Sequence, residues 1–351
     1  MNKIENISSS PSSVLRYDSD IAFDYREIDQ LDEIDFSKNH VVPSIFNSIN
    51  DSLSENRNLE IFFRNNIRCE KWFIASDYAI GNPEKKGNFV TFTLIPHYFN
   101  ILSLMNGINK LQLKDIKKTK YVNADFLRFI NSGLFFHISI ELPDNAHLLI
   151  PNIRKHFEIL LESMFLGAKN KTLRNEISYF QNKLKYSKKD KLLFNIEFIA
   201  CVVSSINLQI LKAIPSLKEI CWFSDRDVIL TNFGDSSKIN IPSMIFNIID
   251  IRSKALFGAV KLPFSKNFNL ILSFGKPESE GKMWYDPLIR IPDYIAGTLA
   301  DNDQKNMTVT KEKFSDVIKI AIADSKYHFI FRINIDGNMA FCTETIYQKN
   351  T

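Results

Sequence analysis

Four acidic residues in this chain occupy positions where metal-dependent chemistry would need them. Each ends or interrupts an apolar run that the sequence predicts to be a regular element, and the four are Asp77, Asp225, Asp227 and Asp293. Hydrolysis of a phosphodiester requires neutralisation of the charge on the attacking and leaving oxygens, and two Mg²⁺ or Mn²⁺ ions about 3.5–4 Å apart provide it. Mg²⁺ is held mainly by carboxylates, water and substrate phosphate. Acids that separate elements carry to one sheet edge would suit this reaction.

Asp293 interrupts the apolar helical run "WYDPLIRIPDYIAGTLAD" (284–301). At 100° per residue it falls among three small residues, Ala296, Gly297 and Ala300. Neighbours of this size cannot shield a carboxylate, so a metal ion, a substrate or another backbone can approach it closely. Pro292 is either the first residue of this helix or a kink within it, and the sequence leaves both open.

The elements that must position these acids alternate between strand-like and helical patterns. The sequence predicts strands at 59–66, 71–81, 89–96, 133–142, 217–227 and 268–275. It predicts helices at 43–55, 153–165, 192–214 and 242–256, a helical section at 97–131, and a short helix near 311–322. A hairpin at 327–347 closes the chain, centred on Asp336–Gly337. Strands in direct succession predict an antiparallel start to a mixed α/β sheet.

This order of elements, with an Asp at the end of the first core strand, another after the fourth and a third on the final helix, resembles the ribonuclease H-like fold. The segment "PLIRIPDYIAGTLAD" is similar to the closing helix of an uncharacterised bacterial family of proposed ribonuclease H-like nucleases. The resemblance covers about 70–303, interrupted by insertions, and is most specific at 288–297. It implies that Asp77, Asp225 or Asp227, and Asp293 are metal ligands.

The resemblance also implies one more acid near the start of the first long helix. We take Glu141 as this metal ligand, and the alternatives are Asp144, Glu158 and Glu162. The chain departs from the family where the family reads Asp-Glu-Ser-Gly, because Tyr78 follows Asp77 here. The implied function is a nuclease that cleaves DNA or RNA with Mg²⁺ or Mn²⁺, as a component of bacterial defence or an effector.

A basic segment at 169–191 is the candidate for contact with nucleic acid. It holds eight Lys and Arg residues interleaved with Tyr179, Phe180 and Tyr186. Phosphate neutralisation combined with aromatic stacking is how single strands are held without sequence readout. The predicted contacts are Arg174, Lys183, Lys185, Lys188 and Lys189. The alternative is a solvent-exposed helical hairpin.

Each of these features also has a structural explanation. Asp77 can start a turn, Asp225 or Asp227 can cap a helix or pair with Arg226, and Asp293 can lie in a first helical turn.

A non-catalytic interaction subunit that docks a protein partner is therefore the main rival function. A glycoside-cleaving enzyme is a third, and it would need two carboxyl groups about 5–9.5 Å apart. His137, in the strand with Phe135 and Phe136, is predicted to be a core or edge residue.

Composition excludes several other classes. None of the 11 Gly residues builds a Gly-rich phosphate loop, and the four Cys are too far apart for a zinc ribbon. With no signal-like N-terminus, we expect a cytoplasmic protein without a membrane anchor. The net charge is +4. We expect an acidic, partly disordered segment at 1–40, a ribonuclease H-like core at 41–305 with a basic helical insertion near 165–192, and a C-terminal helix and β-hairpin at 306–351.

Overall fold

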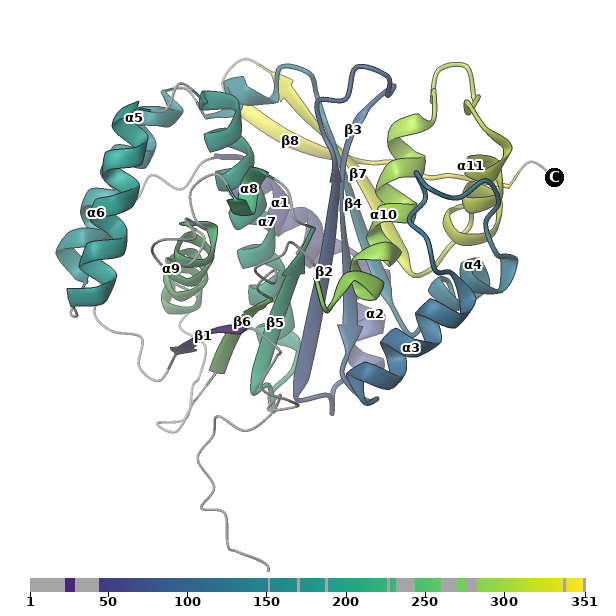
Figure 1. Ribbon diagram of the computed structural model, residues 1–351, viewed down its shortest axis with the longest axis horizontal. Coiled ribbons are helices and arrows are strands. Elements are labelled where there is room, and N and C mark those ends of the chain that lie inside the picture. Colours follow the sequence, from purple (N-terminus) through teal and green to yellow (C-terminus); the bar gives the residue numbers. More distant parts are fainter. Residues whose placement is uncertain are drawn as a thin grey trace, which may run out of the picture.

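A computed structural model shows a mixed α/β protein in which helices cover both faces of one sheet (Figure 1). It describes residues 23–28, 44–150, 152–168, 171–186, 189–225, 228–231, 244–259, 270–275, 283–336 and 339–349. The sheet order is β1-β6-β5-β2-β3-β4-β7-β8. The strands are β1 (Phe23–Ile28), β2 (Lys71–Ala79), β3 (Asn88–Pro96), β4 (Phe136–Leu142), β5 (Glu219–Ser224), β6 (Leu270–Gly275), β7 (His328–Asp336) and β8 (Met339–Glu344).

The centre of the sheet combines antiparallel and parallel pairs. β2, β3 and β4 form the predicted antiparallel start, whereas β5 lies parallel to β2 and β6 lies parallel to β5. β7 adds in parallel to the other side of β4, and β8 pairs antiparallel with β7. The C-terminal hairpin therefore extends the same sheet. β1, from the acidic N-terminal segment, pairs antiparallel with β6.

One face of the sheet is covered by the layer of helices that contains α7, the longest helix described. These include α1 (Ser44–Glu55), α2 (Arg57–Asn65), α5 (Ile153–Gly167), α6 (Lys171–Tyr186), α7 (Asp190–Ala213), the short α8 (Val228–Thr231) and α9 (Met244–Ala259), with the 3₁₀ turn η1 (Ala146–Leu149) between β4 and α5. α7 is long and apolar enough to cross a membrane by length and composition, but nearly all of it is buried inside the fold. It packs against α1, α5 and α9, so core packing accounts for its apolar sequence.

The opposite face carries the helix that contains Asp293. Here lie α3 (Ile101–Leu111), α4 (Ala124–Ile130), α10 (Asp286–Asp301), α11 (Glu312–Val317) and the π-helical turn η2 (Ile318–Ile322). α10 packs directly on β2 and β3. Pro292 lies inside α10, so Asp293 is in the middle of the helix and not in its first turn.

The strand predicted at 59–66 is wrong, because residues 57–65 form α2 and Asn66 is its C-cap. Asn56 caps this helix by accepting a hydrogen bond from the Leu59 N–H at 2.8 Å. Leu59, Phe62 and Phe63 are buried on one side of it, which is the helical spacing of i, i+3 and i+4. The aromatic and β-branched composition of the segment concealed that period.

His137 is a core residue, as predicted. Its ring is fully buried between Thr93 Oγ1, 3.0 Å from Nδ1, and the Ile130 carbonyl, 2.9 Å from Nε2. Burial lowers the pKa of His137 to about 4, although the hydrogen bond to Ile130 acts in the opposite direction. The ring is thus neutral at pH 7 and serves to satisfy buried backbone and hydroxyl groups.

Candidate functional site

Asp77, two residues before the end of β2, and Asp225, directly after β5, lie side by side. Ser76 pairs with Ser224 in parallel register, and the Asp225 N–H donates to the Ser76 carbonyl at 3.1 Å. The next position on each strand is therefore an Asp, and matched positions on neighbouring strands point to the same face. The two carboxyl groups are joined by a side-chain hydrogen bond. One of them must hold a proton for this bond to exist.

Asp293, on α10, is the third acid near this pair. Strand alternation places Asp77 on the same face as Phe73 and Ala75, which is the face that α10 covers. Asp293 is only 8% exposed and Asp77 only 5%. The negative charges of Asp293 and Asp225 both act on Asp77. The structure therefore brings together three of the four predicted acids, and Asp227 lies outside the described residues. We call Asp77, Asp225 and Asp293 the carboxylate cluster.

Burial is the main influence on the charge of the carboxylate cluster. It raises the pKa of Asp77 well above its ordinary value, and the charges of Asp293 and Asp225 raise it further. Burial likewise raises the pKa of Asp293 to about 6, with Asp115 and Asp225 adding to the effect while the Ile116 N–H and Lys117 oppose it. The cluster therefore retains protons close to neutral pH. A bound cation would favour the charged forms and release those protons.

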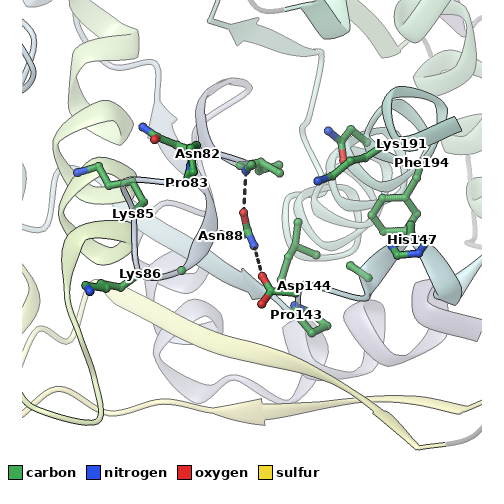
Figure 2. A pocket seen from close by; sticks show the side chains of 16 residues that line it. Asn82, Pro83, Lys85, Lys86, Asn88, Pro143, Asp144, His147, Lys191 and Phe194 are labelled. Atoms are coloured by element: carbon green, nitrogen blue, oxygen red, sulfur yellow. Dashed lines mark hydrogen bonds between the residues drawn. The ribbon is translucent and has the colours of Figure 1, made fainter. Parts of the chain in front are cut away.

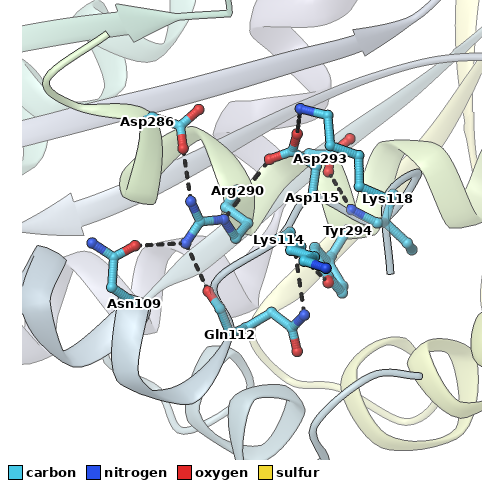
Figure 3. A network of polar contacts seen from close by, with 10 residues as sticks. Asn109, Gln112, Lys114, Asp115, Lys118, Asp286, Arg290, Asp293 and Tyr294 are labelled. Carbon is cyan, nitrogen blue, oxygen red and sulfur yellow. Dashed lines mark hydrogen bonds and ion pairs between the residues drawn. The ribbon is translucent and has the colours of Figure 1, made fainter. Parts of the chain in front are cut away.

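The loop between α3 and α4 closes over α10 beside Asp293 (Figure 3). Asp293 Oδ2 accepts a hydrogen bond from the Ile116 N–H at 2.9 Å. A Cβ on Gly297, one turn further along α10, would lie 3.0 Å from Ile116 Cγ2. This contact explains why position 297 is a glycine, since a residue without a side chain lets the loop approach the helix.

Arg290 holds the first part of that loop. One guanidinium nitrogen donates to Asn109 Oδ1 at 2.8 Å and to the Gln112 carbonyl at 2.7 Å, and the other donates to Asp286 Oδ2 at 2.7 Å (Figure 3). Arg290 is buried, and its Nε also lies 3.9 Å from Asp115 Oδ1. Sequence reasoning missed Arg290, Asp115 and Lys117. The signal for the last two was the charge run "LKDIKKTK" (113–120) inside a section predicted only as helical.

The expected fourth ligand, Glu141, belongs to a different network. Its two oxygens accept from Arg332 Nε and Nη2, each at 2.9 Å, and one of them also accepts from Gln304 Nε2 at 3.0 Å. The alternatives have other partners as well: Asp144 accepts from Asn88, Glu158 pairs with Lys155, and Glu162 accepts from Gln181. Within the ranges that the structure describes, no three His, Cys, Asp or Glu side chains are arranged to hold a metal ion.

The donor chemistry of the carboxylate cluster nonetheless suits a hard cation. Its members offer carboxylate oxygens, which are the ligands that Mg²⁺ and Mn²⁺ prefer. In the present geometry Asp77 and Asp225 are joined by a hydrogen bond, which requires one of the two carboxyl groups to be protonated. Loss of that proton would leave the buried negative charge of Asp77 beside that of the partly buried Asp225, an arrangement that a cation would stabilise. Asp77, Asp225 and Asp293 are the residues that would hold it.

The described residues among the predicted nucleic-acid contacts belong to the helical layer on the face of the sheet opposite α10. Lys183, Lys185 and Arg174 are on α6, which packs on α5, and Lys189 precedes α7. Lys188 is outside the described residues. Figure 1 shows α5 and α6 at the outer edge of the layer that α7 and α9 form, whereas α10 covers the opposite face of the sheet. Arg174 donates to the Ala168 carbonyl at 2.9 Å, a bond that ties α6 to the end of α5.

A cavity of about 330 Å³ opens beyond the ends of β2 and β4 (Figure 2). It lies between the β2–β3 turn, the segment that follows β4 and the first turn of α7. Asn88 links the two segments at the edge of the cavity. It accepts a hydrogen bond from the Gly81 N–H at 2.7 Å and donates one to Asp144 at 3.0 Å. His147, Lys191 and Phe194 line the facing wall (Figure 2). Its lining combines polar and apolar groups, as small-ligand sites do.

Comparison of this chain with protein-family models, with curated proteins and with solved structures found no significant match.

Proposed function

We propose that this protein is a divalent-metal-dependent nuclease that hydrolyses phosphodiester bonds of DNA or RNA. The observation that carries the proposal is the carboxylate cluster, in which Asp77 of β2, Asp225 just after β5 and Asp293 of α10 lie close enough to influence one another's charge. Buried acids held together at a cost in charge repulsion are typical of functional sites. A bound Mg²⁺ or Mn²⁺ supplies a Lewis acid and an activated water for phosphodiester hydrolysis.

We further propose that the core is ribonuclease H-like. The order β4-β3-β2-β5-β6, with two antiparallel pairs followed by two parallel pairs, supports this assignment. The positions of the acids support it too, since Asp77 lies on the first of these strands, Asp225 follows the fourth and Asp293 lies on the helix after the fifth. In this assignment α5, α6 and α7 together fill the connection between the third and fourth strands.

The residues of the chain have distinct tasks in this function. The carboxylates of Asp77, Asp225 and Asp293 provide oxygen donors, and the Ile116 N–H fixes the orientation of Asp293. α10 and the loop over it exclude water from the buried side of the cluster. Lys117 is exposed at its border and interacts electrostatically with Asp77 and Asp293, so it is placed to meet an anionic substrate.

A non-catalytic interaction subunit is the second candidate, and one observation favours it. Glu141, the expected fourth ligand, is occupied by Arg332, and no group of three metal-ligating side chains is set for a cation among the described residues. A glycosidase is less favoured, because the hydrogen-bonded Asp77 and Asp225 are closer together than the roughly 5–9.5 Å that its two carboxyl groups require.

Cleavage assays with matched variants separate these functions. Labelled single-stranded and duplex DNA and RNA are incubated with the wild type in Mg²⁺, Mn²⁺ or EDTA. We expect metal-dependent cleavage that falls at least about 100-fold in Asp77→Asn and Asp293→Asn. Asp301→Asn is the control, because it removes another buried carboxylate from α10 while leaving the cluster intact. Absence of cleavage by the folded wild type, or equal activity in all variants, would leave the interaction subunit as the better explanation.

A further inference from the structure

The loop at 112–121 is a basic surface next to the carboxylate cluster. It carries four lysines against the single acid Asp115, and all four are exposed: Lys114, Lys117, Lys118 and Lys120. Lys118 pairs with Asp115 at 2.7 Å, while the other three extend from the same short stretch. We call residues 112–121 the basic loop. Its charge density raises the question of what it binds.

Backbone groups of the basic loop hold it in place. The Tyr294 hydroxyl donates to the Lys114 carbonyl at 2.8 Å, and Lys313 Nζ donates to the Thr119 carbonyl at 2.8 Å and to the Ile116 carbonyl. Together with the bonds from Arg290 and to Asp293, these fix the loop along its whole length. The ammonium groups of Lys114, Lys117 and Lys120 are thus not needed to anchor the loop. A preorganised row of cations costs little entropy when it binds an anion.

The basic loop also presents an exposed aromatic ring. Tyr121 is 70% exposed, and Lys120 Nζ lies 5.2 Å from the centre of its ring. A surface tyrosine among lysines offers a stacking platform beside phosphate-neutralising charges, which is the combination that single-stranded nucleic acid requires. A duplex has no unstacked base to offer this ring.

We propose that the basic loop binds the sugar-phosphate backbone of a single nucleic-acid strand and guides it across the carboxylate cluster, with Tyr121 stacking on a base. This inference rests on the proposed nuclease function and names the strand-binding surface of that site. Lys117 connects the row of lysines to the carboxylate cluster, because it lies at the border of the cluster. Lys114 and Lys120 extend the row before and after it. In this proposal the nucleic-acid strand binds the basic loop and not the lysines of α6.

Two sets of substitutions that remove equal charge test the assignment. Lys114→Gln, Lys117→Gln and Lys120→Gln are combined in one protein, and Lys171→Gln, Lys183→Gln and Lys185→Gln, all exposed on α6, are combined in the control. Fluorescence anisotropy measures binding of labelled oligo(dT) and oligo(rU) in EDTA, so that no cleavage occurs. We expect the loop variant to bind more weakly and its log-log salt dependence to flatten by about 2, at roughly 0.7 for each phosphate that is no longer neutralised. The α6 variant should match the wild type.

A second pair of variants tests stacking. Tyr121→Ala should weaken oligonucleotide binding at least about fivefold, and Tyr186→Ala, at the exposed end of α6, should have no effect. Equal effects of the two lysine sets, a larger effect of the α6 set, or no binding by the wild type would overturn the inference. Tighter loop-dependent binding of a duplex than of a single strand would overturn it as well.

The outcomes also distinguish this inference from the proposed function. If the wild type cleaves but the loop variant binds and cleaves normally, the nuclease stands and the basic loop is not its strand-binding surface. If single strands bind through the loop but no metal supports cleavage, the loop is a nucleic-acid surface and the catalytic proposal fails. Comparing oligo(dT) with oligo(rU) identifies which of the two strands is preferred.

Discussion

Asp293 and Asp301 are both buried on α10, at 8% and 4% exposed, but their carboxylates have opposite electrostatic surroundings. Asp301 accepts from Lys85 Nζ at 3.0 Å and from the Thr310 N–H and hydroxyl at 2.8 and 2.9 Å. Asp293 accepts from the Ile116 N–H and lies near the negative charges of Asp115 and Asp225. On the same helix, about two turns apart, the charge of Asp301 is compensated by hydrogen bonds and an ion pair, whereas a charge on Asp293 lowers the stability of the fold.

This difference predicts opposite effects on stability. The folded-state pKa of Asp293, about 6, lies above the ordinary value of 3.8, so its stabilising contribution is complete below pH 3.8 and is lost as the pH rises through 6. At pH 8 the charged form costs up to about 3 kcal/mol. We expect Asp293→Asn to raise the free energy of unfolding at pH 8 by about 1–3 kcal/mol, and by much less at pH 4.5. Urea denaturation at both pH values measures it.

Asp301→Asn is the matched substitution, and it should lower the free energy of unfolding at pH 8 by about 1–3 kcal/mol. The reason is that Lys85 would lose its ion-pair partner while remaining mostly buried, with 13% of its side chain exposed. A stabilised Asp301→Asn protein, or an Asp293→Asn protein with the same change in stability at both pH values, would contradict the electrostatic account of α10.

Gly297 and Ile116 should be energetically coupled. A methyl group at position 297 would meet Ile116 Cγ2 at 3.0 Å, which offsets the gain of about 1 kcal/mol that Gly→Ala normally gives inside a helix. We expect Gly297→Ala to be neutral or destabilising in the wild type. In an Ile116→Ala background, which itself costs about 2–4 kcal/mol, the same change should stabilise by about 0.5–1 kcal/mol. A double-mutant cycle by chemical denaturation measures the coupling, and strict additivity would show that the loop does not press on α10.

The buried carboxylate of Glu197, on α7, should need its ion pair with Arg252, on α9, in order to stabilise the fold. Glu197 is fully buried, with Oε1 at 2.5 Å from Arg252 Nη2 and 3.2 Å from His156 Nε2. Burial alone would raise its pKa, but the charge of Arg252 and the contact with His156 lower the pKa to about 2. The carboxylate therefore contributes stability above pH 4.5, and this is lost as the pH falls toward 2.

Arg252→Met should then cost about 3–5 kcal/mol at pH 7, because it leaves a buried carboxylate without its cation. Adding Glu197→Gln should recover a large part of that stability, since it removes the unpaired charge. Thermal and urea unfolding of the single and double variants measure both effects. A double variant no more stable than Arg252→Met would mean that the ion pair is not the source of the stability.

Element types were largely predictable from the sequence because most segments have one dominant period. β2, β3 and α10 were expected close to their observed bounds. An Asp near the end of β2 and another just after β5 were enough to predict that these two acids meet. α2 was missed because its aromatic residues favour strands locally, although Leu59, Phe62 and Phe63 follow a helical spacing. Packing of an apolar face prevailed here over local propensity.

The partners of individual side chains were less predictable, because they depend on contacts between distant segments. Glu141 meets Arg332 only because β7 pairs in parallel with β4, which the order of strands in the sequence does not reveal. Lys117 could not be placed beside Asp293 without knowing that the loop after α3 returns onto α10. Conversely, the charge of 169–191 was evident in the sequence, but its separation from the carboxylate cluster was not.

The burial of α7 has a consequence for synthesis of the chain. Its apolar surface is covered in part by α9, which a ribosome makes only after β5 and α8 have been completed. At roughly 5–20 residues per second, the nascent chain displays a membrane-like helix for several seconds before α9 emerges. During that interval the helix is a ready substrate for ribosome-associated chaperones and for targeting factors that select apolar segments. We expect faster emergence of the rest of the layer to shorten the time for which the apolar surface of α7 is exposed.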